Sequence, residues 1–269
     1  IARVRNCLAE YRRELEALGA ERTLVLGTSA IRDAENGEAF LGEIEWSYGF
    51  VTTVLSGEDE GRLTFRGATA GRPLERDVLV VDIGGGSTEL IAGRDRGAAF
   101  DVSLDVGCVR LTERFLRSDP PQGAELEECA AAVQSLLAER VAEPLRSSAN
   151  GAIGVAGTVT SLAALDLGLV EYEAERIHGH VLTGDAVRRQ LDRLAALPLA
   201  ERRRVPGLDP ERAPVIVAGA IILRETVKHF GLGGVEASER DLLHGAAIEA
   251  ASLPEPVERD APPGAYTCC

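Results

Sequence analysis

The sequence contains no methionine and few aromatic residues, with one tryptophan among 269 residues. Basic residues are also scarce, since 29 lysines and arginines stand against 43 aspartates and glutamates and give a formal net charge of −14. This charge opposes broad binding to nucleic acid or to an anionic membrane surface. No apolar run approaches the roughly 20 residues that a membrane-spanning helix needs. We therefore expect a soluble chain without nucleic-acid or membrane partners, in which any site for an anionic substrate is locally basic or assisted by a metal.

Cysteine is present but shows no spacing typical of a metal site. Cys7, Cys108 and Cys129 are scattered, so we interpret them as buried small apolar residues in a reducing cytoplasm, which is the expected location. The other two cysteines end a segment rich in proline, residues 253–269, that we predict to be disordered.

The most informative segment is residues 78–93. Residues 78–81 are apolar and rich in valine, which predicts a buried strand, and residues 90–92 predict the returning strand of a hairpin. The connection between them supplies glycines, whose backbone N–H groups can approach a ligand closely, and two hydroxyls. These loop residues are Gly84, Gly85, Gly86, Ser87 and Thr88.

Asp82 and Glu89 flank this loop. Two carboxylates facing a glycine-rich loop suit a phosphate held by N–H groups beside a divalent metal held by the carboxylates. The alternative is a plain hairpin with a surface acid at each end. The segment is neither a dinucleotide fingerprint, which needs G-x-G-x-x-G opening a helix, nor a Walker A loop, because no Gly-Lys-Ser/Thr follows.

The remaining pattern alternates strands with helices, which predicts an α/β fold with mixed sheets. The predicted helices cover residues 1–19, 38–48, 124–147, 184–197, 213–230 and 239–251, with a further helix starting at 58. Predicted strands cover residues 23–27, 50–55, 100–104, 152–156 and 235–236, besides the hairpin.

Four stretches, in this order and spacing, resemble the exopolyphosphatase / guanosine pentaphosphate phosphohydrolase (Ppx/GppA) family. They are Thr28–Arg32 with Asn36, Ser56–Leu63, Asp82–Glu89 and Gly154–Thr158. Two later stretches, Gly207–Arg212 and Ser238–Leu243, also fit. The resemblance extends to about residue 252 and is that of a short family form.

The resemblance implies an actin-like, Hsp70-like ATPase (ribonuclease H-like) fold, with two α/β domains and a cleft between them. Residues 1–76 would be the remnant of the first domain and residues 77–252 the second, with 253–269 as a tail. The family's first phosphate loop, of the type Asp-x-Gly-Ser/Thr-Asn-Ser, is absent, so we expect an N-terminally truncated first domain with an exposed edge strand. The resemblance also suggests a homodimer.

The family hydrolyses the terminal phosphoanhydride of polyphosphate, the 5′ γ-phosphate of pppGpp, or both, with Mg²⁺. The resemblance makes Glu60 the general base, and a carboxylate at a helix start beside a phosphate site suits that role. Asp82 and Glu89 would then position Mg²⁺ or the attacking water, and the loop amides would hold phosphate oxygens. The expected activity is an exopolyphosphatase; the alternatives are a pppGpp 5′-phosphohydrolase and a non-catalytic phosphate or nucleotide sensor.

Other candidates carry two interpretations each. Arg32 offers a planar fork for phosphate, or is a surface residue after a strand. Asn36 binds phosphate or caps the next helix. Gly157 and Thr158 form an anion site where a strand turns into a helix, or a plain turn.

Two further patterns receive structural interpretations. His178 and His180 lack a third metal ligand nearby in the sequence, so we interpret them as structural or rim residues. The run 202–204 of three arginines could attract a polyanion, but we interpret it as a solvated face.

Overall fold

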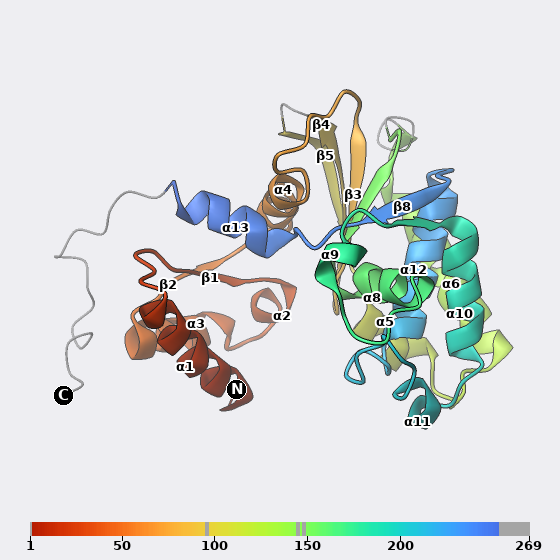
Figure 1. The fold of residues 1–269 in the computed structure, drawn as a ribbon, viewed down its shortest axis with the longest axis horizontal. Helices are drawn as coiled ribbons and strands as arrows, with labels where there is room; N and C mark the ends of the chain where they lie inside the picture. The colour runs from red at the N-terminus through yellow and green to blue at the C-terminus, as the bar shows by residue number, and fades with distance from the viewer. Residues whose placement is uncertain (1, 95–96, 144–145, 147–148, 253–269) are drawn as a thin grey trace. The chain divides into compact units, whose positions relative to one another are not determined.

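The computed structural model describes residues 2–94, 97–143, 146 and 149–252 (Figure 1). By packing, the chain divides into two compact units. Among the described residues, the first contains 2–56 together with 246–252, and the second contains those between 57 and 245. The domain limits predicted above, at residues 76 and 252, stay predictions. Across the described residues, no helix combines the length and the apolar composition that a membrane crossing requires.

The first unit is built on two parallel strands. Its elements are α1 (Ala2–Ala17), β1 (Leu24–Gly27), α2 (Ser29–Arg32), α3 (Gly37–Tyr48) and β2 (Val51–Val54). The strands pair from Leu24 with Val51 to Gly27 with Val54. Its buried core is small, with Leu41 and Ile44 of α3 packed against Phe50. Val51 on β2 is 58% exposed, so this strand presents an apolar side chain to solvent. The predicted truncation of this domain and its exposed edge stay predictions.

The second unit is built on a six-stranded mixed sheet in the order β5-β4-β3-β6-β8-β7. The strands are β3 (Val78–Ile83), β4 (Thr88–Arg94), β5 (Gly97–Leu104), β6 (Ala152–Val155), β7 (Val181–Thr183) and β8 (Gly234–Ala237). β3, β6 and β8 run parallel, whereas β4 pairs antiparallel with both β3 and β5, and β7 pairs antiparallel with β8. The predicted hairpin, and the third strand paired with it, are therefore confirmed.

Helices cover both faces of this sheet. The helices are α4 (Gly57–Ala68), α5 (Cys108–Phe115), α6 (Gly123–Arg140), α8 (Ala156–Asp166), α9 (Ala174–Ile177), α10 (Gly184–Ala195), α11 (Leu199–Arg202) and α12 (Ile216–His229), and α13 (Leu242–Ala250) begins at the end of this unit. The larger core joins one face of the sheet to α5, α6, α8, α10 and α12. The smaller core places Phe65 and Ala68 of α4 against the opposite face, beside β3 and β4 (Figure 1).

The alternation along β3 decides which side chains meet α4. Leu79, Val81 and Ile83 belong to the larger core, whereas Val80 belongs to the core beneath α4. Because side chains alternate between the faces of a strand, Asp82 shares the α4 face with Val80. The same alternation on β4 places Glu89 with Ile91, which also packs beneath α4. Both predicted carboxylates therefore face one helix.

Three sequence interpretations are corrected. The helix predicted for 124–147 ends at Arg140, because Val141 adopts an extended backbone. Cys7 is half-buried rather than buried, whereas Cys108 and Cys129 are buried as predicted. Arg202 is not part of a solvated face.

Arg202 is 3% exposed and its guanidinium donates to three backbone carbonyls. The Nε···O distance to Leu194 is 2.9 Å, the Nη2···O distance to Leu197 is 2.8 Å and the Nη1···O distance to Ala213 is 3.2 Å. These contacts tie α11 to the end of α10 and the segment before α12. A single basic run thus combines one structural arginine with two exposed ones, Arg203 and Arg204.

Candidate active site

Buried carboxylates gather between α4 and the β3–β4 hairpin. Asp82 and Glu89 are cross-strand partners in the antiparallel register. Glu60 is 7% exposed, Asp82 9% and Glu89 2%, so the interpretation of these residues as surface acids is excluded. Glu89 accepts a hydrogen bond from Ser103 Oγ on β5 at 3.0 Å, and Thr64 Oγ1 on α4 lies 3.5 Å from Asp82 Oδ2. The helix, the hairpin and the third strand together position the acids.

Burial and the neighbouring acids act strongly on Asp82. Burial, followed by the charges of Glu89, Asp241 and Glu60, raises the pKa of Asp82 from its usual 3.8 to about 8, and the Thr64 hydroxyl opposes this shift in part. Burial disfavours the charged form of a carboxyl, and neighbouring negative charges do the same. The site therefore has a strong capacity to take up a proton or a cation. Asp241, which precedes α13, is a fourth acid that the motif-based residue assignment missed.

The glycine loop is oriented by α5. The carbonyl of Gly84 accepts from the N–H of Cys108 at 2.9 Å, and that of Gly85 accepts from Val109 at 3.0 Å and from Arg110 at 3.1 Å. The Gly86 carbonyl accepts from Arg110 Nε at 2.9 Å. Because the N–H and C=O of one planar peptide point in opposite directions, the N–H groups that follow these carbonyls point away from α5. Such a row of amides can bind an anion.

The loop hydroxyls differ in their roles. The Thr88 hydroxyl is fully buried and donates to the Val106 carbonyl at 2.6 Å, so it holds the loop rather than a ligand. The Gly84 N–H donates to the Ser87 carbonyl at 3.0 Å, which closes the turn. Phosphate binding by this loop would therefore rest on the amides of Gly85, Gly86 and Ser87.

A second turn joins β6 to α8, where the sequence predicted one. Ala156, the first residue of α8, has φ 63°, a left-handed conformation that is costly for a residue other than glycine. The guanidinium of Arg212 lies so close to Gly157 that an added Cβ would meet its Cζ at 2.2 Å. Thr158 is 2% exposed and contacts Gly219 of α12, so its side chain belongs to the core. This turn can offer backbone amides next to the cationic guanidinium of Arg212.

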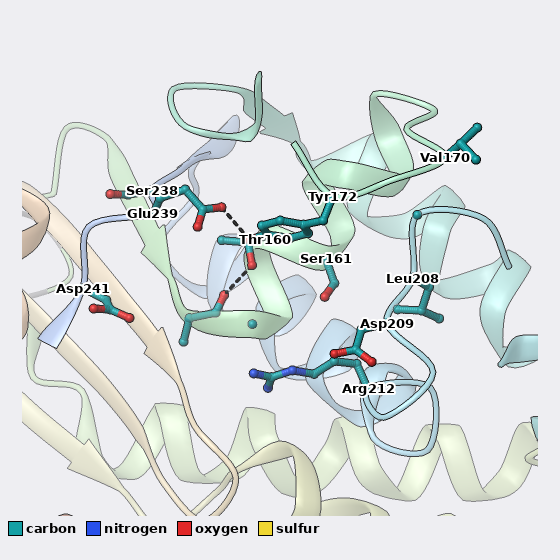
Figure 2. A pocket seen from close by; sticks show the side chains of 13 residues that line it. Thr160, Ser161, Val170, Tyr172, Leu208, Asp209, Arg212, Ser238, Glu239 and Asp241 are labelled. Atoms are coloured by element: carbon teal, nitrogen blue, oxygen red, sulfur yellow. Dashed lines mark hydrogen bonds between the residues drawn. The ribbon is translucent and has the colours of Figure 1, made fainter. Parts of the chain in front are cut away.

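A cavity of about 540 Å³ opens beside this turn (Figure 2). Its polar lining includes Thr160, Ser161, Tyr172, Asp209, Arg212, Ser238, Glu239 and Asp241. The hydroxyl of Tyr172 donates to Glu239 Oε1 at 2.5 Å. Burial, and then this hydrogen bond, raises the pKa of Tyr172 to about 12. Asp241 lines the cavity and also acts on Asp82, so the cavity and the carboxylate cluster adjoin.

Sequence reasoning did not assign roles to these lining residues. Most of them lie in the stretches 207–212 and 238–243, which we used only as signs of family resemblance. Their concentration in two short stretches was the available signal. Tyr172 carried no such signal, because it follows a turn with no periodic pattern.

Arg32 and Asn36 lie in the first unit. Arg32 ends α2, and its Nη1 donates to the Leu55 carbonyl at 2.7 Å, so it supports the chain after β2. Asn36 occupies the N-cap position of α3, but its side chain makes no capping hydrogen bond there. The predicted roles of both residues in phosphate binding stay predictions.

No group of three or more histidine, cysteine, aspartate or glutamate side chains suited to a metal ion occurs among the described residues. His180 Nε2 lies 2.9 Å from Asp166 Oδ2, and His178 Nδ1 lies 3.3 Å from the backbone nitrogen of Glu239. These contacts support the structural interpretation of both histidines. A protein-only metal cage is therefore not a feature of this part of the chain, but Mg²⁺ is commonly bound by one or two carboxylates with water and phosphate.

The sequence model of the Ppx/GppA phosphatase family matches residues 1–252, and the chain belongs to this family. The actin-like fold class expected from the resemblance is thereby confirmed. A solved structure of the Ppx/GppA family member from Aquifex aeolicus is 32% identical, with a TM-score of 0.81 over 92% of this chain and 79% of that one.

Among curated relatives, Exopolyphosphatase 2 of Mycobacterium tuberculosis is 36% identical, over 93% of this chain and 82% of that protein. The Guanosine-5'-triphosphate,3'-diphosphate pyrophosphatase of Aeromonas hydrophila is 28% identical, over 84% of this chain and 44% of that protein.

Proposed function

We propose that this chain is an exopolyphosphatase, which releases terminal orthophosphate from inorganic polyphosphate. The observation that carries the proposal is the burial of Glu60 beside Asp82 and Glu89, next to a loop whose carbonyls are tied back to α5. Greater similarity to Exopolyphosphatase 2 of Mycobacterium tuberculosis than to the Guanosine-5'-triphosphate,3'-diphosphate pyrophosphatase of Aeromonas hydrophila supports the choice of substrate.

In the proposed mechanism, the amides of Gly85, Gly86 and Ser87 hold oxygens of the terminal phosphate. Glu60 accepts a proton from a water molecule as the water oxygen attacks the terminal phosphorus. The bond from that phosphorus to the bridging oxygen breaks, and its electron pair stays with the shortened chain. Donors aimed at the phosphate oxygens stabilise the charge that develops.

The carboxylate cluster fits a divalent cation. The charges of Glu89, Asp241 and Glu60 act on buried Asp82, and a bound cation would relieve this repulsion. Mg²⁺ is the hard cation that phosphate chemistry uses, and it needs only one or two carboxylates beside water and phosphate. Asp82 and Glu89 are the residues that would hold it. When bound, Mg²⁺ would neutralise charge on the phosphate oxygens.

One observation favours pppGpp as a second candidate substrate. The cavity beside Arg212 is large enough for a nucleoside, and Tyr172 at its wall is 52% exposed and can stack on a base. Carboxylates such as Glu239 can accept hydrogen bonds from the N–H groups of guanine. Competition between polyphosphate and pppGpp measures which substrate the site prefers.

The deciding experiment measures phosphate release from long-chain polyphosphate and from pppGpp, each with Mg²⁺. Glu60→Gln should lower kcat by about 10²-fold or more, because the general base is lost. Glu58→Gln, an exposed position on the same turn of α4, is the matched control and should keep full activity. Full activity of Glu60→Gln would refute the assignment of the base. Polyphosphate binding by the wild type without turnover would favour the alternative of a non-catalytic sensor.

A further inference from the structure

A basic groove lies away from the glycine loop, on the side of α4 opposite to Glu60. We call it the arginine groove; it has a volume of about 280 Å³ and is lined by Arg62, Phe65, Arg66, Thr69, Arg72, Leu74, Arg94 and Ala98. Four of these residues are arginines, and none of the described lining residues carries a carboxylate. In a chain with a net charge of −14, such a concentration of positive charge is a local exception.

Three elements of the second unit build the groove. Arg62 and Arg66 lie one turn apart on α4, Arg72 follows the end of that helix, and Arg94 ends β4. Residues four apart share one face of a helix, so Arg62 and Arg66 point to the same side. Phe65, which is 3% exposed, belongs to the core beneath this wall.

Acids outside the lining hold several of these arginines. Arg72 pairs with Glu236, and its Nη2 lies 3.4 Å from His178 Nε2. The Nε of Arg94 lies 3.4 Å from Asp77 Oδ1. A guanidinium has five N–H donors in a planar fork, so one carboxylate partner orients the group without using its whole capacity.

The groove is separate from the carboxylate cluster. On a helix with 100° per residue, Arg62 and Arg66 lie about 200° and 240° around α4 from Glu60. The arginines therefore face away from the acids and from the terminal phosphate at which Glu60 would activate water. Arg66 is also displaced by about 9 Å along the helix axis.

We propose that the arginine groove is a binding site for a polyphosphate chain, at a segment remote from the end that is cleaved. This inference rests on the proposed function only in naming the substrate as the ligand. Guanidinium groups suit phosphate oxygens because they can bind them through paired hydrogen bonds. The described lining offers no exposed aromatic ring for base stacking, which favours an inorganic chain over single-stranded nucleic acid.

The test replaces two arginines from different elements, in the double variant Arg66→Gln/Arg94→Gln. The matched control is Arg188→Gln/Arg203→Gln, which removes the same charge from exposed positions elsewhere. Steady-state kinetics are measured on long-chain polyphosphate and on tripolyphosphate, which has only two phosphates beyond the one that is cleaved. The groove variant should raise KM for the long chain about fivefold, because the loss of two exposed charge contacts weakens binding by about that factor. Its kinetics on tripolyphosphate should stay unchanged.

A binding measurement separates this proposal from the proposed activity. Fluorescently labelled long-chain polyphosphate is titrated onto Glu60→Gln protein with and without the two groove substitutions, and far-UV circular dichroism checks the fold. Weaker binding only in the groove variant supports the groove, even if the wild type hydrolyses nothing. Equal binding with and without the substitutions overturns the groove, and so does an equal loss in the Arg188→Gln/Arg203→Gln control.

Discussion

Asp82→Asn should stabilise the folded chain at neutral pH in the absence of metal. The folded protein holds a proton on Asp82 up to a pKa of about 8, whereas the unfolded chain releases it near 3.8. The stability that the folded chain gains by holding this proton is therefore fully present below pH 4 and is lost as the pH rises from about 4 to 8. Above about pH 8 no further stability is lost through Asp82. An asparagine carries no charge and escapes this loss.

The size of the effect follows from the shift. At pH 7 the difference in proton affinity corresponds to at most about 4 kcal/mol, and relaxation of the neighbouring acids reduces it to about 2–4 kcal/mol. For a unit of this length, the variant should melt about 5–15 °C higher at pH 8 and at nearly the wild-type temperature at pH 4.

The assay is thermal unfolding in EDTA across pH 4–9, followed by far-UV circular dichroism. Fluorescence is unsuitable because the only tryptophan, Trp46, lies in the first unit. Asp185→Asn is the control, because that carboxyl is exposed and paired with Arg188. A melting difference that does not grow between pH 4 and pH 8 would refute the raised pKa of Asp82. Added Mg²⁺ should raise the melting temperature of the wild type more than that of Asp82→Asn.

Two further predictions concern positions fixed by close contacts. Arg202→Met should destabilise the second unit by about 2–4 kcal/mol, because three carbonyls lose their donor. Arg203→Met is the exposed control, and equal melting temperatures of the two variants would contradict the prediction. Gly157→Ala should leave the fold intact but displace the Arg212 guanidinium and so raise KM about tenfold. Gly151→Ala is the control and should leave KM unchanged, because an added Cβ there meets nothing within 4 Å. An unchanged KM in Gly157→Ala would exclude Arg212 from substrate binding.

The sequence predicted the parts of the site that depend on local pattern. The apolar residues 78–81 and 90–92 defined the two strands of the hairpin, and its register follows from the short glycine loop, so Asp82 and Glu89 could be placed opposite each other. The turn at Gly157 was predictable because a buried strand ends immediately before it. Short elements were missed, among them β7 and α9, because three or four residues are too few to show a period.

The parts of the site that depend on tertiary contacts could not be predicted from the local sequence pattern. Nothing in the local pattern distinguishes Arg202 from Arg203, because Arg202 is buried where α11 meets the end of α10 and the segment before α12. Asp241 and Arg212 join the site only when the segments after β8 and before α12 return to the sheet. Long-range return of a segment leaves no periodic trace in the sequence around it.

The placement of Glu60 depends on glycines that lower the helix propensity of α4. α4 contains three glycines, although glycine disfavours helix by about 1 kcal/mol per residue relative to alanine. A Cβ at Gly61 would lie 3.1 Å from Ile91 Cγ1, and one at Gly67 would lie 2.0 Å from the backbone oxygen of Asp241. The missing side chains therefore let α4 approach both the sheet and the Asp241 segment. That close approach is what places Glu60 within electrostatic reach of Asp82 and Asp241, so the weakened helix propensity and the clustered acids have one cause.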